Sequence, residues 1–336
     1  MHLDRKSSAP VSLVGKSPPL RACIIDMNNG VPNQGIRCLR TLIESFYAHA
    51  RERNPELDLE IVHVEPRNLG DVPPRDCHIY LSSGGPGSPF DGADEPWAHA
   101  YREFLDWIYQ EGEREGEASK GLFAVCFSYE LSMVHFGIAK MEPRPTRKFG
   151  VMPVYMTEAG MKSDLFGPFG DRLFAWEHRS WQAVDLDEAR LASLDGACWA
   201  RESRDGVSKG ESLLAFKIGS SIKTTLFHPE ADRPGALAWI ASPDQAQAVI
   251  EAYGETTYLR MLRTLDDPMR LARTRALTIP GWLARRWNAM APLHGWCEVP
   301  APVYDETAVL REFGTPPGQG SGEPAGRLSI EPGEGG

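Results

Sequence analysis

Three segments of this chain end in residues whose types could carry out acyl-transfer chemistry. Cys126 follows the apolar run Gly121–Val125, and His228 follows the run Thr224–Phe227, with Glu230 two positions further on. A cysteine attacks a carbonyl carbon as the thiolate, so it needs a base beside it. An imidazole can be that base, and a carboxylate can hold its orientation. These residues therefore predict a nucleophile, its base and an orienting acid.

The third segment supplies glycines. Residues 81–89 follow another apolar strand and read Leu-Ser-Ser-Gly-Gly-Pro-Gly-Ser-Pro. Glycines leave backbone N–H groups open to an approaching oxyanion. We expect the N–H of Gly85 and the N–H of Phe127, directly after the nucleophile, to be the oxyanion donors. Gly87 is expected to belong to the same oxyanion and substrate-binding loop.

The elements that position these residues alternate between strands and helices in the first half of the chain. Expected strands cover residues 21–27, 59–64, 78–81 and 121–125, and expected helices cover residues 34–53 and 96–110. This alternation predicts βαβ crossovers and a mainly parallel sheet. Reactive groups then gather at the carboxyl ends of the strands, where all three segments end.

The pattern changes after about residue 147. Shorter strands are expected over residues 151–156, 173–176 and 213–218, and helices over 234–240 and 246–253. Charged residues 111–120 are expected to form a solvated connection. Further on, Pro268 and Pro280 are expected to interrupt the helical spacing.

In this order, the Gly-Gly-Pro-Gly loop, the Cys126 elbow and the Phe-His-Pro-Glu ending resemble the class I (triad-type) glutamine amidotransferase family. The chain is similar in these marks to the glutaminase domain of GMP synthase. The resemblance implies an α/β, flavodoxin-like fold of three layers, with a mainly parallel open sheet and helices on both faces. It also implies antiparallel strands between the nucleophile and the histidine. The substrate it implies is glutamine or a related γ-glutamyl amide.

The chain departs from the family's pattern in the elbow, at Ala124, Ser128 and Glu130, and beside a histidine that it keeps, at Arg179 and Trp181. The family's elbow reads Gly-x-Cys-x-Gly-x-Gln, and Glu130 stands where that glutamine helps to hold the substrate. A carboxylate there would repel a substrate carboxylate, or would select an ammonium group. His178 occupies the place of a histidine turn that contacts the glutamine backbone in the family. A surface turn without function is an equally weighted interpretation of His178.

Composition excludes several classes of protein. The chain has 336 residues and a formal net charge of -10, which argues against nucleic-acid binding. No apolar run approaches the ~20 residues of a transmembrane segment, and the first residues lack a secretory signal. Six scattered cysteines without a Cys-x-x-Cys pair indicate neither a zinc site nor a disulfide framework. The five besides Cys126 are expected to be buried, and the cytoplasm is the expected location.

We expect a disordered lead-in over residues 1–19, the amidotransferase-like domain over 20–254, a helical C-terminal extension over 255–298 and a disordered tail over 299–336. From Arg260 to Arg286 the extension carries seven arginines. It is either a helix that docks on a membrane surface or a partner, or a terminal helix pair packed on the sheet with arginines in water. The second interpretation is favoured, because an amphipathic stripe is typical of a surface helix.

The leading hypothesis is a glutaminase that hands ammonia to a separate synthetase or transferase subunit. The first alternative is a γ-glutamyl amide hydrolase with the same triad. The second is a degenerate, non-catalytic regulatory or docking module. No phosphate loop and no dinucleotide fingerprint occurs in the sequence, so we expect no cofactor and no metal.

Overall fold

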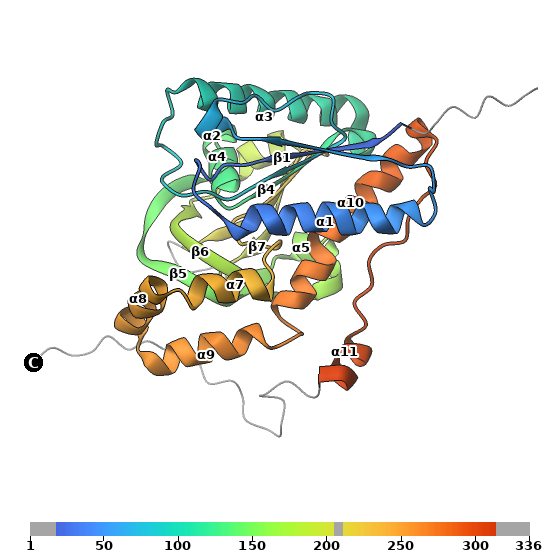
Figure 1. The fold of residues 1–336 in the computed structure, drawn as a ribbon. Helices are drawn as coiled ribbons and strands as arrows, with labels where there is room; N and C mark the ends of the chain where they lie inside the picture. The colour runs from blue at the N-terminus through green and yellow to red at the C-terminus, as the bar shows by residue number, and fades with distance from the viewer. Residues whose placement is uncertain (1–17, 205–210, 314–336) are drawn as a thin grey trace, which may run out of the picture.

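The computed structural model describes residues 18–204 and 211–313. Its strands are β1 (Leu20–Ile25), β2 (Leu59–Val64), β3 (Ile79–Ser82), β4 (Gly121–Val125), β5 (Lys140–Met156), β6 (Arg172–Val184), β7 (Ala197–Arg201), β8 (Leu213–Ile218) and β9 (Ile222–Thr225). Within these ranges they form one nine-stranded sheet in the order β2-β1-β3-β4-β9-β8-β7-β5-β6 (Figure 1).

The helices are α1 (Gln34–Arg51), α2 (Pro66–Leu69), α3 (Pro96–Glu115), α4 (Phe127–Phe136), α5 (Glu158–Lys162), α6 (Glu188–Ser193), α7 (Arg233–Ile240), α8 (Pro243–Tyr253), α9 (Glu255–Leu265), α10 (Leu271–His294) and α11 (Glu306–Phe313). The described residues also contain two short 3₁₀ helices, η1 (Gly116–Ala118) and η2 (Gly167–Phe169).

The sheet has a parallel half and an antiparallel half. Strands β2, β1, β3, β4 and β9 pair in parallel, whereas β9–β8, β8–β7, β7–β5 and β5–β6 are antiparallel. The expected mainly parallel sheet is therefore not confirmed, because the sheet is mixed. Only residues 219–221 separate β8 from β9. A connection that short permits antiparallel pairing alone.

Helices cover both faces of the parallel half (Figure 1). On one face the Tyr80 ring packs against Phe104 of α3, with ring centroids 5.0 Å apart. On the other face the Phe123 ring packs against Trp282 of α10, with centroids 5.5 Å apart. Leu122 lies opposite Tyr80 in the parallel register, and side chains alternate along a strand, so these contacts are on opposite faces. The three-layer arrangement is thereby explained.

Helix α3 is longer than its apolar pattern predicts. We expected residues 111–120 to be a solvated connection, but the helix continues to Glu115, and Glu111 and Gly112 are buried. The Ser220 hydroxyl donates a 2.7 Å hydrogen bond to the Gly112 carbonyl. A Cβ at Gly112 would lie 2.5 Å from the Ser221 hydroxyl. The missing side chain thus lets the last turns of α3 lie against the β8–β9 turn.

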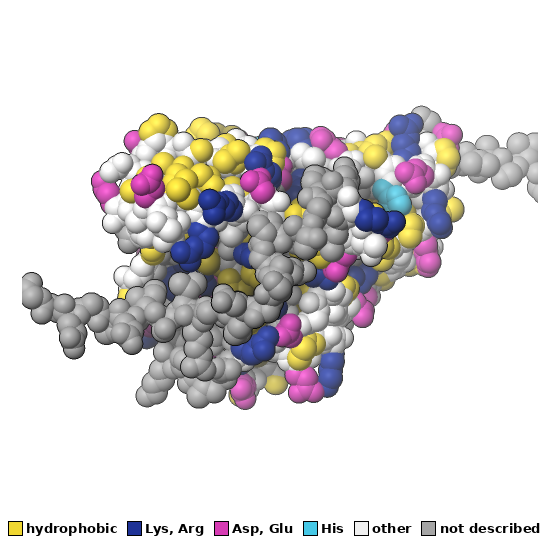
Figure 2. All heavy atoms as spheres, turned by 90° about the horizontal axis from the view of Figure 1, so that it is seen from below, with side chains coloured by type: hydrophobic (Ala, Val, Ile, Leu, Met, Phe, Trp, Pro, Cys, Tyr) yellow, Lys and Arg dark blue, Asp and Glu magenta, His cyan; other side chains and the backbone are white. Residues whose placement is uncertain are grey.

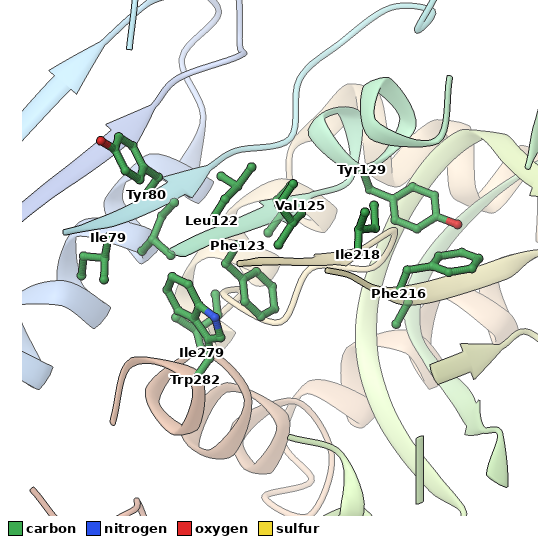
Figure 3. Packing of buried hydrophobic residues seen from close by; sticks show 14 of the residues in the cluster. Ile79, Tyr80, Leu122, Phe123, Val125, Tyr129, Phe216, Ile218, Ile279 and Trp282 are labelled. Atoms are coloured by element: carbon green, nitrogen blue, oxygen red, sulfur yellow. The ribbon is translucent and has the colours of Figure 1, made fainter. Parts of the chain in front are cut away.

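Helix α10 belongs to the main hydrophobic core. Ile279, Trp282, Leu283 and Trp287 are buried in the same cluster as the central strands, and Figure 3 shows Ile279 and Trp282 beneath the sheet. Pro268 lies between α9 and α10. The expected interruption at Pro280 is wrong, because that residue lies inside α10. Packing of the apolar face outweighs the local preference of proline.

Several arginines of the extension bond within the molecule. Arg286 is buried, and its guanidinium donates to the carbonyls of Glu117 and Ser220. The Arg270 guanidinium lies 4.5 Å from the centre of the Phe174 ring. On the face seen in Figure 2, basic and acidic side chains are interspersed among apolar ones. The expectation of arginines in water is therefore wrong for Arg286, which joins α10 to η1 and to the β8–β9 turn.

The chain beyond α10 differs from the expected disordered tail in the residues that the structure describes. Val299 is buried, and its backbone N–H and carbonyl bond to the Asn288 side chain at 2.8 Å each. Helix α11 follows. Residues 1–17 of the expected lead-in and 314–336 of the tail lie outside the described residues. None of the described helices is long and apolar enough to cross a membrane.

Candidate active site

Cys126 stands at a sharp turn between β4 and α4. Its backbone has φ 52° and ψ -106°, a strained combination for a residue with a side chain. Its N–H donates a 2.8 Å hydrogen bond to the Thr225 carbonyl of the neighbouring strand. The side chain is buried, and it lies at the N-terminus of α4. The partial positive charge of a helix N-terminus stabilises a thiolate there.

His228 and Glu230 form an oriented pair after β9. The His228 N–H donates a 2.9 Å hydrogen bond to the Trp176 carbonyl of β6. The Nδ1 atom of His228 lies 2.7 Å from Oε1 of Glu230, which is buried. A carboxylate can only accept a hydrogen bond, so we assign the ring proton to Nδ1. The Nε2 atom is then free to take a proton.

The imidazole and the thiol meet above Gly84. A Cβ built on Gly84 would lie 2.9 Å from Cε1 of His228 and 3.7 Å from Sγ of Cys126. Burial alone lowers the pKa of His228, but the Glu230 carboxylate and a hydrogen bond with Cys126 outweigh it and raise the pKa well above its ordinary value. The raised pKa makes the His228 imidazole a stronger base for the Cys126 proton. Gly84 leaves room for this contact.

The glycine loop that follows β3, defined here as residues 83–87, lies beside the cysteine. A Cβ on Gly85 would fall 2.1 Å from the Met27 carbonyl oxygen, so only glycine fits. Gly87 has φ +104°, which also favours glycine. Phe127 is the first residue of α4, so its N–H has no partner within the helix. Gly85 and Gly87 line the same cavity as Cys126.

A cavity of about 340 Å³ opens over Cys126. Its lining includes Asn28, Glu130, Arg147, Arg179 and Trp181. The Arg179 side chain is fully buried, and its guanidinium bonds Glu177 at 2.6 Å. Arg147 forms no ion pair with a carboxylate in the described residues. The cavity thus holds a cation available to a ligand carboxylate.

Glu130 lies in this cavity with only 3% of its surface exposed. Burial raises the pKa of its carboxyl to about 8, although Arg179 and His228 act in the opposite direction. At neutral pH the neutral carboxyl therefore predominates. The repulsion of a substrate carboxylate that we expected from the sequence is consequently weak at pH 7. A neutral carboxyl has a donor and an acceptor, as a glutamine amide does.

His178 lies on β6 and also lines the cavity. Burial, Arg147 and His228 lower the pKa of His178 to about 3, so the ring is neutral. The Arg147 guanidinium donates to its Nε2 atom. The ring of Trp239 lies against it, with centroids 4.4 Å apart. His178 is therefore not an exposed turn residue, and it holds Arg147 at the cavity wall.

Three residues around the site were not among the candidates expected from the sequence. Asn28 is buried, lines the cavity, and its Oδ1 atom has no hydrogen-bond partner in the described residues. Its position shortly after β1 is the available signal, because ligands bind at the carboxyl ends of parallel strands. Arg147 lies in the irregular stretch between Pro143 and Lys148 of β5, and Arg67 lies in α2. No local pattern marks these two.

A second cavity, of about 450 Å³, adjoins the first and shares His178, His228 and Trp239 with it. Its remaining wall includes Trp176 and Asp232.

In the described parts of the chain, no group of three or more His, Cys, Asp or Glu side chains is arranged to hold a metal ion. Four of the five cysteines besides Cys126 are buried as expected, whereas Cys297 is exposed.

Comparison with known proteins gives a likeness of fold. No protein-family model and no curated protein sequence matches the chain. The structure of a glutamine amidotransferase from Thermotoga maritima matches with a TM-score of 0.52 at 13% identity, over 81% of this chain and 98% of that one. A glutamine amidotransferase from Methylobacillus flagellatus matches with a TM-score of 0.52 at 15% identity, over 86% and 100%. The chain therefore has an α/β class I glutamine amidotransferase-like fold.

Proposed function

We propose that the chain is a glutaminase of the glutamine amidotransferase type. The single observation that carries this proposal is the meeting of Cys126 with the His228–Glu230 pair above Gly84, at the floor of the first cavity. Nucleophile, base and orienting acid are the parts that acyl transfer needs. The likeness of fold to glutamine amidotransferases agrees with it.

In the first half of the reaction, the Cys126 sulfur forms a bond to the amide carbon and its proton passes to Nε2 of His228. The carbonyl electron pair moves onto the oxygen, where the N–H groups of Gly85 and Phe127 are the proposed donors. The carbon–nitrogen bond then breaks as His228 gives the proton to the nitrogen. Ammonia leaves, and a thioester remains on Cys126.

In the second half, water attacks the thioester carbon and gives a proton to His228. The carbon–sulfur bond breaks, His228 returns the proton to the sulfur, and the acid leaves. Glu230 keeps the imidazole oriented through both halves and stabilises the imidazolium. We infer that Arg147, with no carboxylate partner in the described residues, pairs with the substrate's α-carboxylate. The ammonia would pass to a separate synthetase or transferase subunit in the cytoplasm.

The second cavity favours one further candidate, a γ-glutamyl amide hydrolase. Ammonia needs no cavity of about 450 Å³, whereas an amine leaving group does, and this cavity is also lined by His228. The same bonds would form and break, with an organic amine leaving in place of ammonia. Release of amine from γ-glutamyl amides, compared with release of ammonia from glutamine, separates the two candidates.

The proposal is tested by labelling and turnover together. A chloroketone analogue of glutamine should alkylate Cys126, and peptide mass spectrometry would identify the labelled residue. The rate of this alkylation should fall by at least about tenfold in His228→Ala. Cys126→Ser should lose ammonia release from glutamine and keep the wild-type circular dichroism spectrum. Continued turnover by Cys126→Ser, or preferential labelling of exposed Cys297, would disprove the assignment.

A further inference from the structure

The shape of the glycine loop is fixed by its own serine. The Ser83 hydroxyl donates a 2.8 Å hydrogen bond to the Gly84 carbonyl. In a trans peptide the carbonyl and the N–H point in opposite directions, so this bond also sets the direction of the Gly85 N–H. That N–H donates to no acceptor within the described residues. A donor is therefore held ready beside the cavity.

The Ser83 side chain is itself held from several sides. Its hydroxyl oxygen accepts a 2.9 Å hydrogen bond from the Met27 N–H. Its backbone carbonyl accepts a 2.6 Å hydrogen bond from the hydroxyl of Ser128 on α4. The Ser128 hydroxyl in turn lies 2.7 Å from the Ser82 hydroxyl. The Tyr101 hydroxyl donates a 3.0 Å hydrogen bond to that Ser82 oxygen. These groups are buried, so a change of loop shape would leave polar atoms unpaired.

Arg67 holds the other end of the loop. One guanidinium nitrogen, Nη1, donates to the carbonyls of Met27 and Pro86 at 2.8 Å each. The guanidinium also lies 4.3 Å from the centre of the Phe127 ring, directly after the nucleophile. Arg67 thus joins the segment after β1, the glycine loop and the start of α4. Both oxyanion donors proposed above belong to segments that it contacts.

We propose that Ser83 and Arg67 are positioning residues that keep the glycine loop in its oxyanion-binding shape in the isolated chain, so that amide hydrolysis needs no activating partner. The inference rests on the proposed function, because it concerns the same acyl-transfer site. It adds a statement about regulation. Among the described residues the Gly85 N–H has no acceptor, so it need not give up a hydrogen bond there before it binds an oxyanion.

The test compares Ser83→Ala and Arg67→Met with two matched controls. Ser132→Ala removes a buried hydroxyl of α4 that donates to the Ser128 carbonyl at 2.8 Å. Arg75→Met removes an arginine that lies 5.5 Å from the centre of the Trp107 ring and precedes the start of β3, whereas Arg67 contacts the loop that follows the end of β3. Each protein is assayed alone on glutamine and on p-nitrophenyl acetate. Alkylation of Cys126 by iodoacetamide, which forms no oxyanion, is measured in parallel.

The isolated wild-type chain should turn over without a partner. Ser83→Ala and Arg67→Met should each lower kcat about tenfold or more on the ester, with KM within about threefold, because oxyanion stabilisation acts in the transition state. The rates at which iodoacetamide alkylates Cys126 in these two variants should stay within about twofold of the wild-type rate. Both control variants should keep kcat and the alkylation rate within about twofold of wild type.

Three results would overturn the proposal. Loop variants that keep wild-type kcat would show that the loop needs neither residue. A parallel loss of kcat and alkylation would place the damage at the nucleophile. A wild-type chain that alkylates but cleaves neither substrate would show that the loop is not preformed. Ester cleavage that depends on Ser83, without glutamine cleavage, would support the loop proposal and count against the glutamine assignment alone.

Discussion

At the scale of single residues, Glu130 gives the site a dependence on pH. Its pKa of about 8 means that a negative charge enters the cavity as the pH rises above neutrality. The Coulomb term between like charges at 4 Å is about 1 kcal/mol in water and about 4 kcal/mol at an effective dielectric constant of about 20. We therefore expect KM for glutamine to rise at least about fivefold between pH 7 and pH 9.5 in the wild type, and to stay flat in Glu130→Gln. Initial rates over this range measure it.

Glu130 also links pH to stability. Its folded-state pKa is raised above the ordinary value, so its contribution to stability is complete below pH 4.5 and is lost as the pH rises through about 8. Glu130→Gln should therefore gain stability relative to the wild type between pH 5 and pH 8. Urea unfolding at both pH values would measure the gain. If the difference in free energy of unfolding between Glu130→Gln and the wild type were the same at pH 5 and pH 8, the Glu130 carboxyl would be solvated in the folded protein.

Glu230 orients the base and is not itself the base. Glu230→Gln should lower kcat by about 10²–10⁴-fold, less than His228→Ala does, because the imidazole keeps its backbone position without the carboxylate. The control is Glu251→Gln on α8, and its kcat should equal that of the wild type. The Glu251 carboxylate accepts a 2.7 Å hydrogen bond from the Gln247 amide. Equal losses for Glu230→Gln and His228→Ala would give Glu230 a different role.

At the scale of elements, α10 is the helix whose packing is tested most directly. Trp282 is 2% exposed and packs on Phe123 of the central strand β4. Trp282→Ala should lower the free energy of unfolding by about 3–5 kcal/mol, because a large buried side chain leaves a cavity. Leu293→Ala, at a residue of the same helix that is 67% exposed, should change it by less than about 0.5 kcal/mol. Chemical denaturation followed by circular dichroism compares the two.

At the scale of the whole molecule, α10 bears on the expected domain boundary at residue 254. The buried side chains of α10 contact both α1 and the sheet, and Phe46 lies 6.0 Å from Trp287 between ring centroids. We expect a chain ending at residue 254 to fail to unfold cooperatively, because its sheet would expose that face to water. A chain ending at residue 313 should unfold as the full chain does. Cooperative unfolding of the shorter chain would support a boundary at residue 254.

The sequence by itself determined the elements and the reactive residues at their ends. Apolar runs with period two and helical spacing are local, so they place the four leading strands and the helices after them to within a few residues. Cys126, His228 and Glu230 each follow such a run, and parallel topology brings strand ends to one edge. Their meeting could therefore be expected from the order of residues alone.

Only the tertiary structure decided which other side chains meet there. Arg147 reaches the cavity through an irregular stretch of β5, and Arg67 reaches the glycine loop from a single turn of helix. The Thr274 hydroxyl of α10 donates a 2.6 Å hydrogen bond to the Phe174 carbonyl, a contact between residues 100 positions apart. Such contacts depend on how whole elements pack, and packing energy is summed over many residues with no local signature. The burial that keeps Glu130 neutral at pH 7 arises in the same way.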